Sequence, residues 1–105
     1  MTNVLFIGLG SAGQRHLRIL INLLKRKKAN FFCYRSTLRN LVIDDNLKTK
    51  KVRSLTKFYN IREISPGDFN KFKFDIVFIT NPIYQHIKYA LKFAKLGSNI
   101  FVEKP

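Results

Sequence analysis

The chain has 105 residues, the size of one small domain, and 46% of them are hydrophobic, which excludes wholesale disorder. A single cysteine, Cys33, excludes an internal disulfide framework and favours a reducing, cytoplasmic location, and no apolar run reaches the length of a membrane span. The net charge of +14 raises nucleic acid as a possible partner.

The first predicted elements are a strand and a glycine turn. Residues 4–7 form a continuous apolar run, as in a strand covered on both faces. Gly8, Gly10 and Gly13 follow with the G-x-G-x-x-G spacing of a dinucleotide-binding turn. Gly8 would allow the tight turn, Gly10 the close approach of backbone to a pyrophosphate, and Gly13 the packing of a helix against the strand. The following residues, Ser11 and Ala12, would offer helix N-terminal N–H groups to the phosphates.

A first helix is predicted over residues 12–26, with one apolar face made by Leu17, Leu20, Ile21 and Leu24. The densest basic run, residues 25–28, falls at its end, where the helix dipole favours cations. The other charges are spread along the chain, without the aromatic–basic pattern of an RNA-binding sheet or the Cys/His spacing of a zinc site. Nucleic-acid binding is therefore the less favoured interpretation, and part of the positive field could serve a dinucleotide.

A second strand is predicted over residues 30–34, and its end bears on the choice of cofactor. NAD-binding units commonly place an Asp or Glu there to accept hydrogen bonds from the ribose. This chain instead has Arg35, followed by Ser36, a pair that suits the 2′-phosphate of NADP. We therefore expect NADP or NAD as cofactor, with NADP slightly preferred and Arg39 assisting. The alternative is that Arg35 is solvated and the domain does not discriminate.

The middle of the chain gives weaker patterns. Leu38, Leu41 and Val42 suggest a short helical face, residues 44–46 a break, and residues 48–51 a solvated loop or helix end. A third strand is predicted over residues 55–59, and residues 65–68 have the composition of a turn.

Residues 75–80 give a clear pattern again and predict a buried strand, with Asp75 followed by an apolar run. Asn81 fits a helix N-cap, Pro82 the first helical position and Gly97 the residue after the helix, before a last strand at residues 98–102. The order of elements predicts an α/β, Rossmann-type doubly wound parallel sheet, strand order 3-2-1-4-5, as one domain over residues 1–105. The cofactor is expected at the carboxyl ends of strands 1 and 4.

Several motifs in order resemble the oxidoreductase family of glucose–fructose oxidoreductase and inositol dehydrogenase (Gfo/Idh/MocA). They are residues 80–82 (T-N-P), His86, Gly97 and residues 103–105 (E-K-P), together with the G-Q-R-H sequence at 13–16. The resemblance implies that Thr80, Asn81, Pro82 and His86 lie beside the cofactor, and that Arg15 and His16 lie near the cofactor or substrate cleft. It also places Glu103 and Lys104 at the nicotinamide, with Lys104 as the one catalytic candidate. Packing or capping is the alternative for His86, and no metal site is expected.

Members of that family continue into a sixth strand and a second domain that carries most of the substrate-binding and proton-transferring groups. We therefore expect this chain to be the cofactor-binding domain of an NAD(P)-dependent dehydrogenase acting on a sugar, cyclitol or sugar-nucleotide hydroxyl, inactive by itself. Without a neighbour the last strand is an exposed edge, so pairing with another copy is possible. The alternatives are a non-catalytic NAD(P)-sensing regulatory module and a basic nucleic-acid-binding domain.

Overall fold

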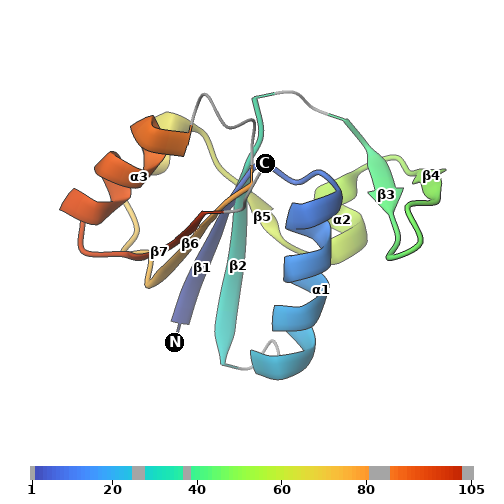
Figure 1. The fold of residues 1–105 in the computed structure, drawn as a ribbon, viewed down its shortest axis with the longest axis horizontal. Helices are drawn as coiled ribbons and strands as arrows, with labels where there is room; N and C mark the ends of the chain where they lie inside the picture. Colours follow the sequence, from blue (N-terminus) through green and yellow to red (C-terminus); the bar gives the residue numbers. More distant parts are fainter. Residues whose placement is uncertain (1, 25–27, 37–38, 81–85, 103–105) are drawn as a thin grey trace.

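Strand β1 (Thr2–Ile7) lies at the centre of a parallel sheet in the computed structural model, which describes residues 2–24, 28–36, 39–80 and 86–102. The sheet order is β5 (Arg62–Glu63), β2 (Ala29–Tyr34), β1, β6 (Ile76–Ile79) and β7 (Asn99–Val102). Helices α1 (Ser11–Leu24) and α2 (Leu55–Tyr59) lie on one face of the sheet, and α3 (His86–Lys95) lies on the other (Figure 1). The predicted doubly wound fold and the predicted strand arrangement are thus confirmed.

The two faces of β1 each bury one half of the core. Val4 and Phe6 pack in the cluster that includes Leu17 of α1, and Leu5 and Ile7 pack in the cluster that includes Phe93 of α3. This alternation follows from the two-residue period of a strand, and it explains why residues 4–7 are all apolar. The sheet is therefore fixed from both sides.

Helix α1 begins one residue earlier than predicted and is described to Leu24, while residues 25–27 lie outside the described residues. Its buried face contains Gly13, Gln14 and Leu17. Helix α3 ends at Lys95, and Gly97, predicted as the residue after the helix, has φ +83°. The N–H of Gly97 donates to the carbonyl of Ala94 at 3.1 Å and the N–H of Ser98 to that of Phe93 at 3.0 Å, a Schellman cap.

The third strand was predicted at the wrong place. Residues 55–59 form helix α2, because the side chain of Ser54 caps the N–H of Lys57 and Asn60 adopts the left-handed conformation at the other end. Leu55 and Tyr59, one helical turn apart, supply its buried side. The third strand of the sheet is β5, two residues long, whose partners in β2 are Phe32 and Cys33.

The segment between β2 and α2 is a hairpin, not the predicted short helix and loop. Strand β3 (Leu41–Ile43) pairs antiparallel with β4 (Thr49–Lys51), and Leu38 lies outside the described residues. The predicted break at residues 44–46 is the hairpin turn, where the Asp44 carboxylate accepts from the N–H groups of Asn46 and Lys48, both at 2.9 Å. Figure 1 shows the hairpin beyond α1 and α2, away from the sheet.

Candidate functional site

The glycine turn lies at the carboxyl edge of the sheet, held by strands on both sides of β1. Gly8 has φ +93°, which a side chain would disfavour. Its N–H donates to the carbonyl of Tyr34 at the end of β2, at 2.8 Å. The hydroxyl of Thr80, just after β6, donates to the carbonyl of Gly8 at 3.0 Å. The turn is therefore fixed where ligands bind in open parallel sheets.

The other two glycines of the motif differ in the space around them. A Cβ on Gly13 would lie 2.8 Å from the hydroxyl oxygen of Thr80 and 3.0 Å from the carbonyl oxygen of Gly8. A Cβ on Gly10 would meet nothing within 4 Å. Gly13 thus allows α1 to pack against the turn, whereas the exposed backbone at Gly10 is open to a ligand.

The first turn of α1 brings three predicted residues together. Ser11, Ala12 and Arg15 line a cavity of about 190 Å³ between the helix and the turn of the hairpin, where Asp44 and Asp45 form the opposite side. The first N–H groups of a helix have no partner within it, so this end of α1 offers donors to an anion. Its first turn contains no acidic residue. The helix N–H donors and Arg15 suit a phosphate, whereas Asp44 and Asp45 across the cavity offset part of that positive charge.

His16 faces a different part of the molecule. Its ring stacks on Phe78 of β6, with centroids 5.4 Å apart, and it is half-buried. The same face of the sheet carries Phe6 and Phe101, each stacked on Phe78 at about 5 Å. The structure therefore places His16 against β6, the strand that directly precedes Thr80.

Sequence reasoning missed Gln14, the buried polar side chain at the centre of this region, with 1% of its surface exposed. Its amide nitrogen donates to the carbonyls of Leu9, at 3.1 Å, and Leu41, at 2.8 Å. Its oxygen accepts from the N–H of Ile43 and the hydroxyl of Tyr59, both at 2.8 Å. One amide thus joins the glycine turn, the hairpin and α2. The signal was its place on the buried face of α1, three residues before Leu17.

Arg35, one residue past β2, is held in an ion pair that the sequence did not reveal. Its Nε and Nη2 atoms donate to the two carboxylate oxygens of Glu63 at 2.9 and 2.7 Å, and its Nη1 atom donates to the carbonyl of Arg39 at 2.8 Å. The hydrogen bond to Glu63 is the main cause that raises the pKa of Arg35. Ser36 is exposed beside it. Glu63 could not have been found while the third strand was misplaced.

The remaining predicted residues lie outside the described residues. They are Asn81, Pro82, Glu103 and Lys104, together with the side chain of His86. Their expected places at the cofactor stay predictions. Within the described part of the chain, no helix is long and apolar enough to cross a membrane, and no cluster of three or more His, Cys, Asp or Glu residues could hold a metal ion.

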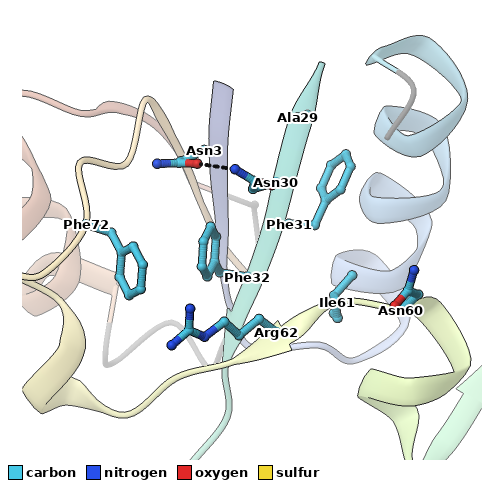
Figure 2. Close-up of a pocket in the computed structure, with 9 residues that line it drawn as sticks. All are labelled: Asn3, Ala29, Asn30, Phe31, Phe32, Asn60, Ile61, Arg62 and Phe72. Atoms are coloured by element: carbon cyan, nitrogen blue, oxygen red, sulfur yellow. Dashed lines mark hydrogen bonds between the residues drawn. The ribbon is translucent and has the colours of Figure 1, made fainter. Parts of the chain in front are cut away.

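A cavity of about 540 Å³ lies at the opposite end of β2, away from the glycine turn. Figure 2 shows Phe31 and Ile61 on one side of the strand and Phe32, Phe72 and Arg62 on the other. The amide of Asn30 donates to the Asn3 side chain at 3.1 Å along its wall. Because ligands of parallel α/β sheets bind at the carboxyl ends of the strands, we place the candidate site at the glycine turn.

Comparisons with known proteins bear on the fold and on the family of the chain. No curated protein sequence matches the chain. A myo-inositol 2-dehydrogenase structure from Lactobacillus plantarum is 22% identical with a TM-score of 0.68, covering 99% of this chain and 28% of that one. A Gfo/Idh/MocA family oxidoreductase from Vibrio cholerae is 20% identical with a TM-score of 0.69, and the match covers 100% of this chain and 30% of that one. A UDP-N-acetylglucosamine 3-dehydrogenase from Acidithiobacillus ferrooxidans is 16% identical with a TM-score of 0.69, covering 98% and 28%.

These similarities establish the fold, and the chain spans less than a third of the length of each of the three structures. The family assignment comes from a separate finding. Residues 2–105 match the model of the oxidoreductase family with an NAD-binding Rossmann fold, GFO_IDH_MocA. That match includes the glycine turn, the strand end at Arg35 and the residues around Thr80. The chain therefore belongs to the Gfo/Idh/MocA oxidoreductase family and is an NAD-binding Rossmann domain of that family.

Proposed function

We propose that the chain is the cofactor-binding domain of an NAD(P)-dependent oxidoreductase that acts on a hydroxyl group of a sugar, cyclitol or sugar nucleotide. The observation that carries the proposal is the open backbone at Gly10, next to the N-terminus of α1 and at the carboxyl edge of β1. A side chain there would occupy the space that a pyrophosphate needs. The named structural neighbours, an inositol dehydrogenase and a sugar-nucleotide dehydrogenase, support the substrate class.

Each part of the dinucleotide has residues suited to it. Backbone N–H groups at Gly10, Ser11 and Ala12 would hold the pyrophosphate, with Arg15 close by. Arg35 and Ser36 would contact the adenosine ribose, where the arginine supports a slight preference for NADP. When bound, the cofactor supplies a nicotinamide C4 that accepts or donates a hydride.

The nicotinamide end of the site depends on residues outside the described part of the chain. We propose that Asn81, Pro82 and His86 flank the cofactor and that Glu103 and Lys104 orient its reactive ring. General acid–base chemistry on a hydroxyl needs a group within hydrogen-bond reach of it. Lys104, the one catalytic candidate that the family resemblance supplies, lies outside the described residues. We therefore propose that the chain alone binds nucleotide without turnover. We also propose that it is a cytoplasmic protein.

Calorimetric titration with NADPH and NADH tests the proposal. We expect both nucleotides to bind the wild-type chain, and Gly10→Ala to weaken both about tenfold or more, since the added methyl group stands where the phosphates approach. Gly67→Ala is the matched control, because a Cβ there meets only Ser65 Oγ, at 4.0 Å, and no atom of the glycine turn within that distance. A folded wild-type chain that binds neither nucleotide contradicts the proposal.

The same preparation separates the alternatives. A nucleotide-sensing module would bind NAD(P) as well as a dehydrogenase domain does, so binding alone does not separate these two functions. They are distinguished by turnover with inositols and UDP-sugars, measured after a substrate domain from a structural neighbour has been fused to the chain. A nucleic-acid-binding domain would bind DNA or RNA at physiological salt, with an affinity that falls steeply as salt rises. We expect no such binding above background.

A further inference from the structure

The ion pair between Arg35 and Glu63 has one sheltered and one accessible member. The side chain of Arg35 has 7% of its surface exposed, and that of Glu63 has 31%. The two residues come from neighbouring parallel strands, because Glu63 is the register partner of Cys33 and Arg35 follows β2 by one residue. A molecule that approaches this edge therefore meets the carboxylate more readily than the guanidinium.

This pair lies beside the glycine turn. Tyr34, which directly precedes Arg35, accepts the hydrogen bond of the Gly8 N–H at 2.8 Å. The end of the strand after the glycine helix is where Rossmann domains contact the adenosine ribose, and an acidic residue commonly accepts the hydroxyl hydrogen bonds there. Strand β2 carries no acid at its end, yet β5 brings Glu63 to the same edge.

The two charges have opposite effects on a 2′-phosphate. An arginine attracts the phosphate, whereas a carboxylate repels it and accepts hydrogen bonds from a 2′-hydroxyl. Three of the five N–H groups of Arg35 are used by Glu63 and by the carbonyl of Arg39, and the charge of Arg35 is matched by the charge of Glu63. The attraction of Arg35 for a 2′-phosphate is thus largely offset where it stands.

We propose that Glu63 is a specificity-determining residue: it supplies, from β5, the carboxylate that β2 lacks, and it limits the preference for NADP that Arg35 alone would give. This inference rests on the proposed function, since it concerns how the same site discriminates between two nucleotides. It predicts that the two members of the pair shift selectivity in opposite directions.

The test is calorimetric measurement of Kd for NADPH and NADH with four chains: wild type, Glu63→Gln, Arg35→Gln and the double variant. Glu63→Gln lowers the Kd ratio of NADPH to NADH about tenfold, and Arg35→Gln raises it by a similar factor. The neutral glutamine keeps the size of the side chain. Asp68→Asn is the matched control, because it removes the same charge from another ion pair, with Lys71, and leaves the ratio unchanged.

Removing one partner of a sheltered ion pair can unfold a domain, so circular dichroism accompanies each titration. The comparison of Arg35→Gln with the double variant avoids this difficulty, since neither leaves the sheltered arginine unpaired. Adding Glu63→Gln to Arg35→Gln must then recover NADPH binding about tenfold while NADH binding stays constant or weakens. If Glu63 had a purely structural role, its substitution would change the Kd of NADPH and the Kd of NADH by the same factor.

The outcomes separate this inference from the proposed function. If both nucleotides bind and Glu63→Gln leaves the Kd ratio of NADPH to NADH unchanged, both in the wild type and in Arg35→Gln, the inference is overturned. The proposed function then stays intact. Failure of the folded wild-type chain to bind either nucleotide overturns both.

Discussion

Gly10 and Gly13 respond differently to an added methyl group, although they are three residues apart in one motif. Gly13→Ala places a Cβ 2.8 Å from the Thr80 hydroxyl and 3.0 Å from the Gly8 carbonyl, so the Thr80 side chain or α1 must shift. We expect a loss of about 1–3 kcal/mol in the free energy of unfolding. Gly10→Ala, with open space around it, should change stability by less than about 0.5 kcal/mol. Urea denaturation of both variants checks the contrast; equal losses would contradict the packing at Gly13.

Cys33 should be chemically inert in the folded chain. Its thiol is buried in β2, and burial is the main cause that raises its pKa to about 12. The thiolate, which is the reactive form, is therefore nearly absent at pH 8. Ellman's reagent at pH 8 should react slowly with the native protein and quickly after guanidinium is added. Rapid reaction without denaturant would show that β2 opens readily.

At the scale of single residues, the glycine turn between β1 and α1 could be predicted from the sequence, because Gly8, Gly10 and Gly13 stand at a fixed spacing directly after an apolar run. Gln14 and Glu63 were missed because their roles depend on residues far along the chain. Gln14 forms hydrogen bonds with Leu41, Ile43 and Tyr59, and no pattern in the sequence around Gln14 predicts these partners. Residues defined by long-range contacts need a correct placement of every element around them.

The hairpin formed by β3 and β4 is attached to α1 by two kinds of contact. The buried amide of Gln14 bonds to the hairpin backbone, whereas Arg18 forms an ion pair at 2.6 Å with Asp45, whose side chain is 71% exposed. Arg18 also donates to the carbonyl of Ile43 and to the Tyr59 hydroxyl, at 2.8 and 2.9 Å. The hairpin therefore depends more on buried hydrogen bonds than on its surface charge.

Two substitutions compare these contacts. Gln14→Leu leaves several buried polar groups without partners and should lower the free energy of unfolding by about 1–3 kcal/mol or more. Asp45→Ala removes only an exposed ion pair and should cost less than about 1 kcal/mol. Thermal denaturation measures both. A larger effect for Asp45→Ala would mean that the ion pair, not the amide, fixes the hairpin.

Helix α1 has a strong helical period, and β1 and β6 are continuous apolar runs, so these three elements were predicted nearly at their bounds, while the segment from residue 38 to 63 was not. Helix α2 has five residues, too few for a helical period to stand out from the alternation of a strand. Strand β5 consists of Arg62 and Glu63, a polar pair that no hydrophobic pattern marks. Its place at the sheet edge is set by pairing with β2, which is a tertiary effect.

The whole molecule carries 20 basic and six acidic residues within extents of 36 × 34 × 23 Å. At about 10 mM salt the screening length is about 30 Å, comparable with the molecule itself, so its like charges repel one another. We expect the melting temperature to rise by a few degrees as sodium chloride increases to about 150 mM. The double substitution Lys48→Glu and Lys50→Glu, at exposed positions of the hairpin, should flatten this dependence. A melting temperature that falls with salt would indicate that attractive ion pairs dominate.

The attachment of the hairpin through Gln14 has a consequence for how the protein can evolve. In the hairpin, Gln14 forms hydrogen bonds only with backbone groups, the carbonyl of Leu41 and the N–H of Ile43. Every residue except proline provides both of these groups. The side chains at positions 41 and 43 can therefore change without loss of the hydrogen bonds that attach the hairpin to α1. The glutamine itself has no such freedom, because all four of its hydrogen bonds would be lost with its amide.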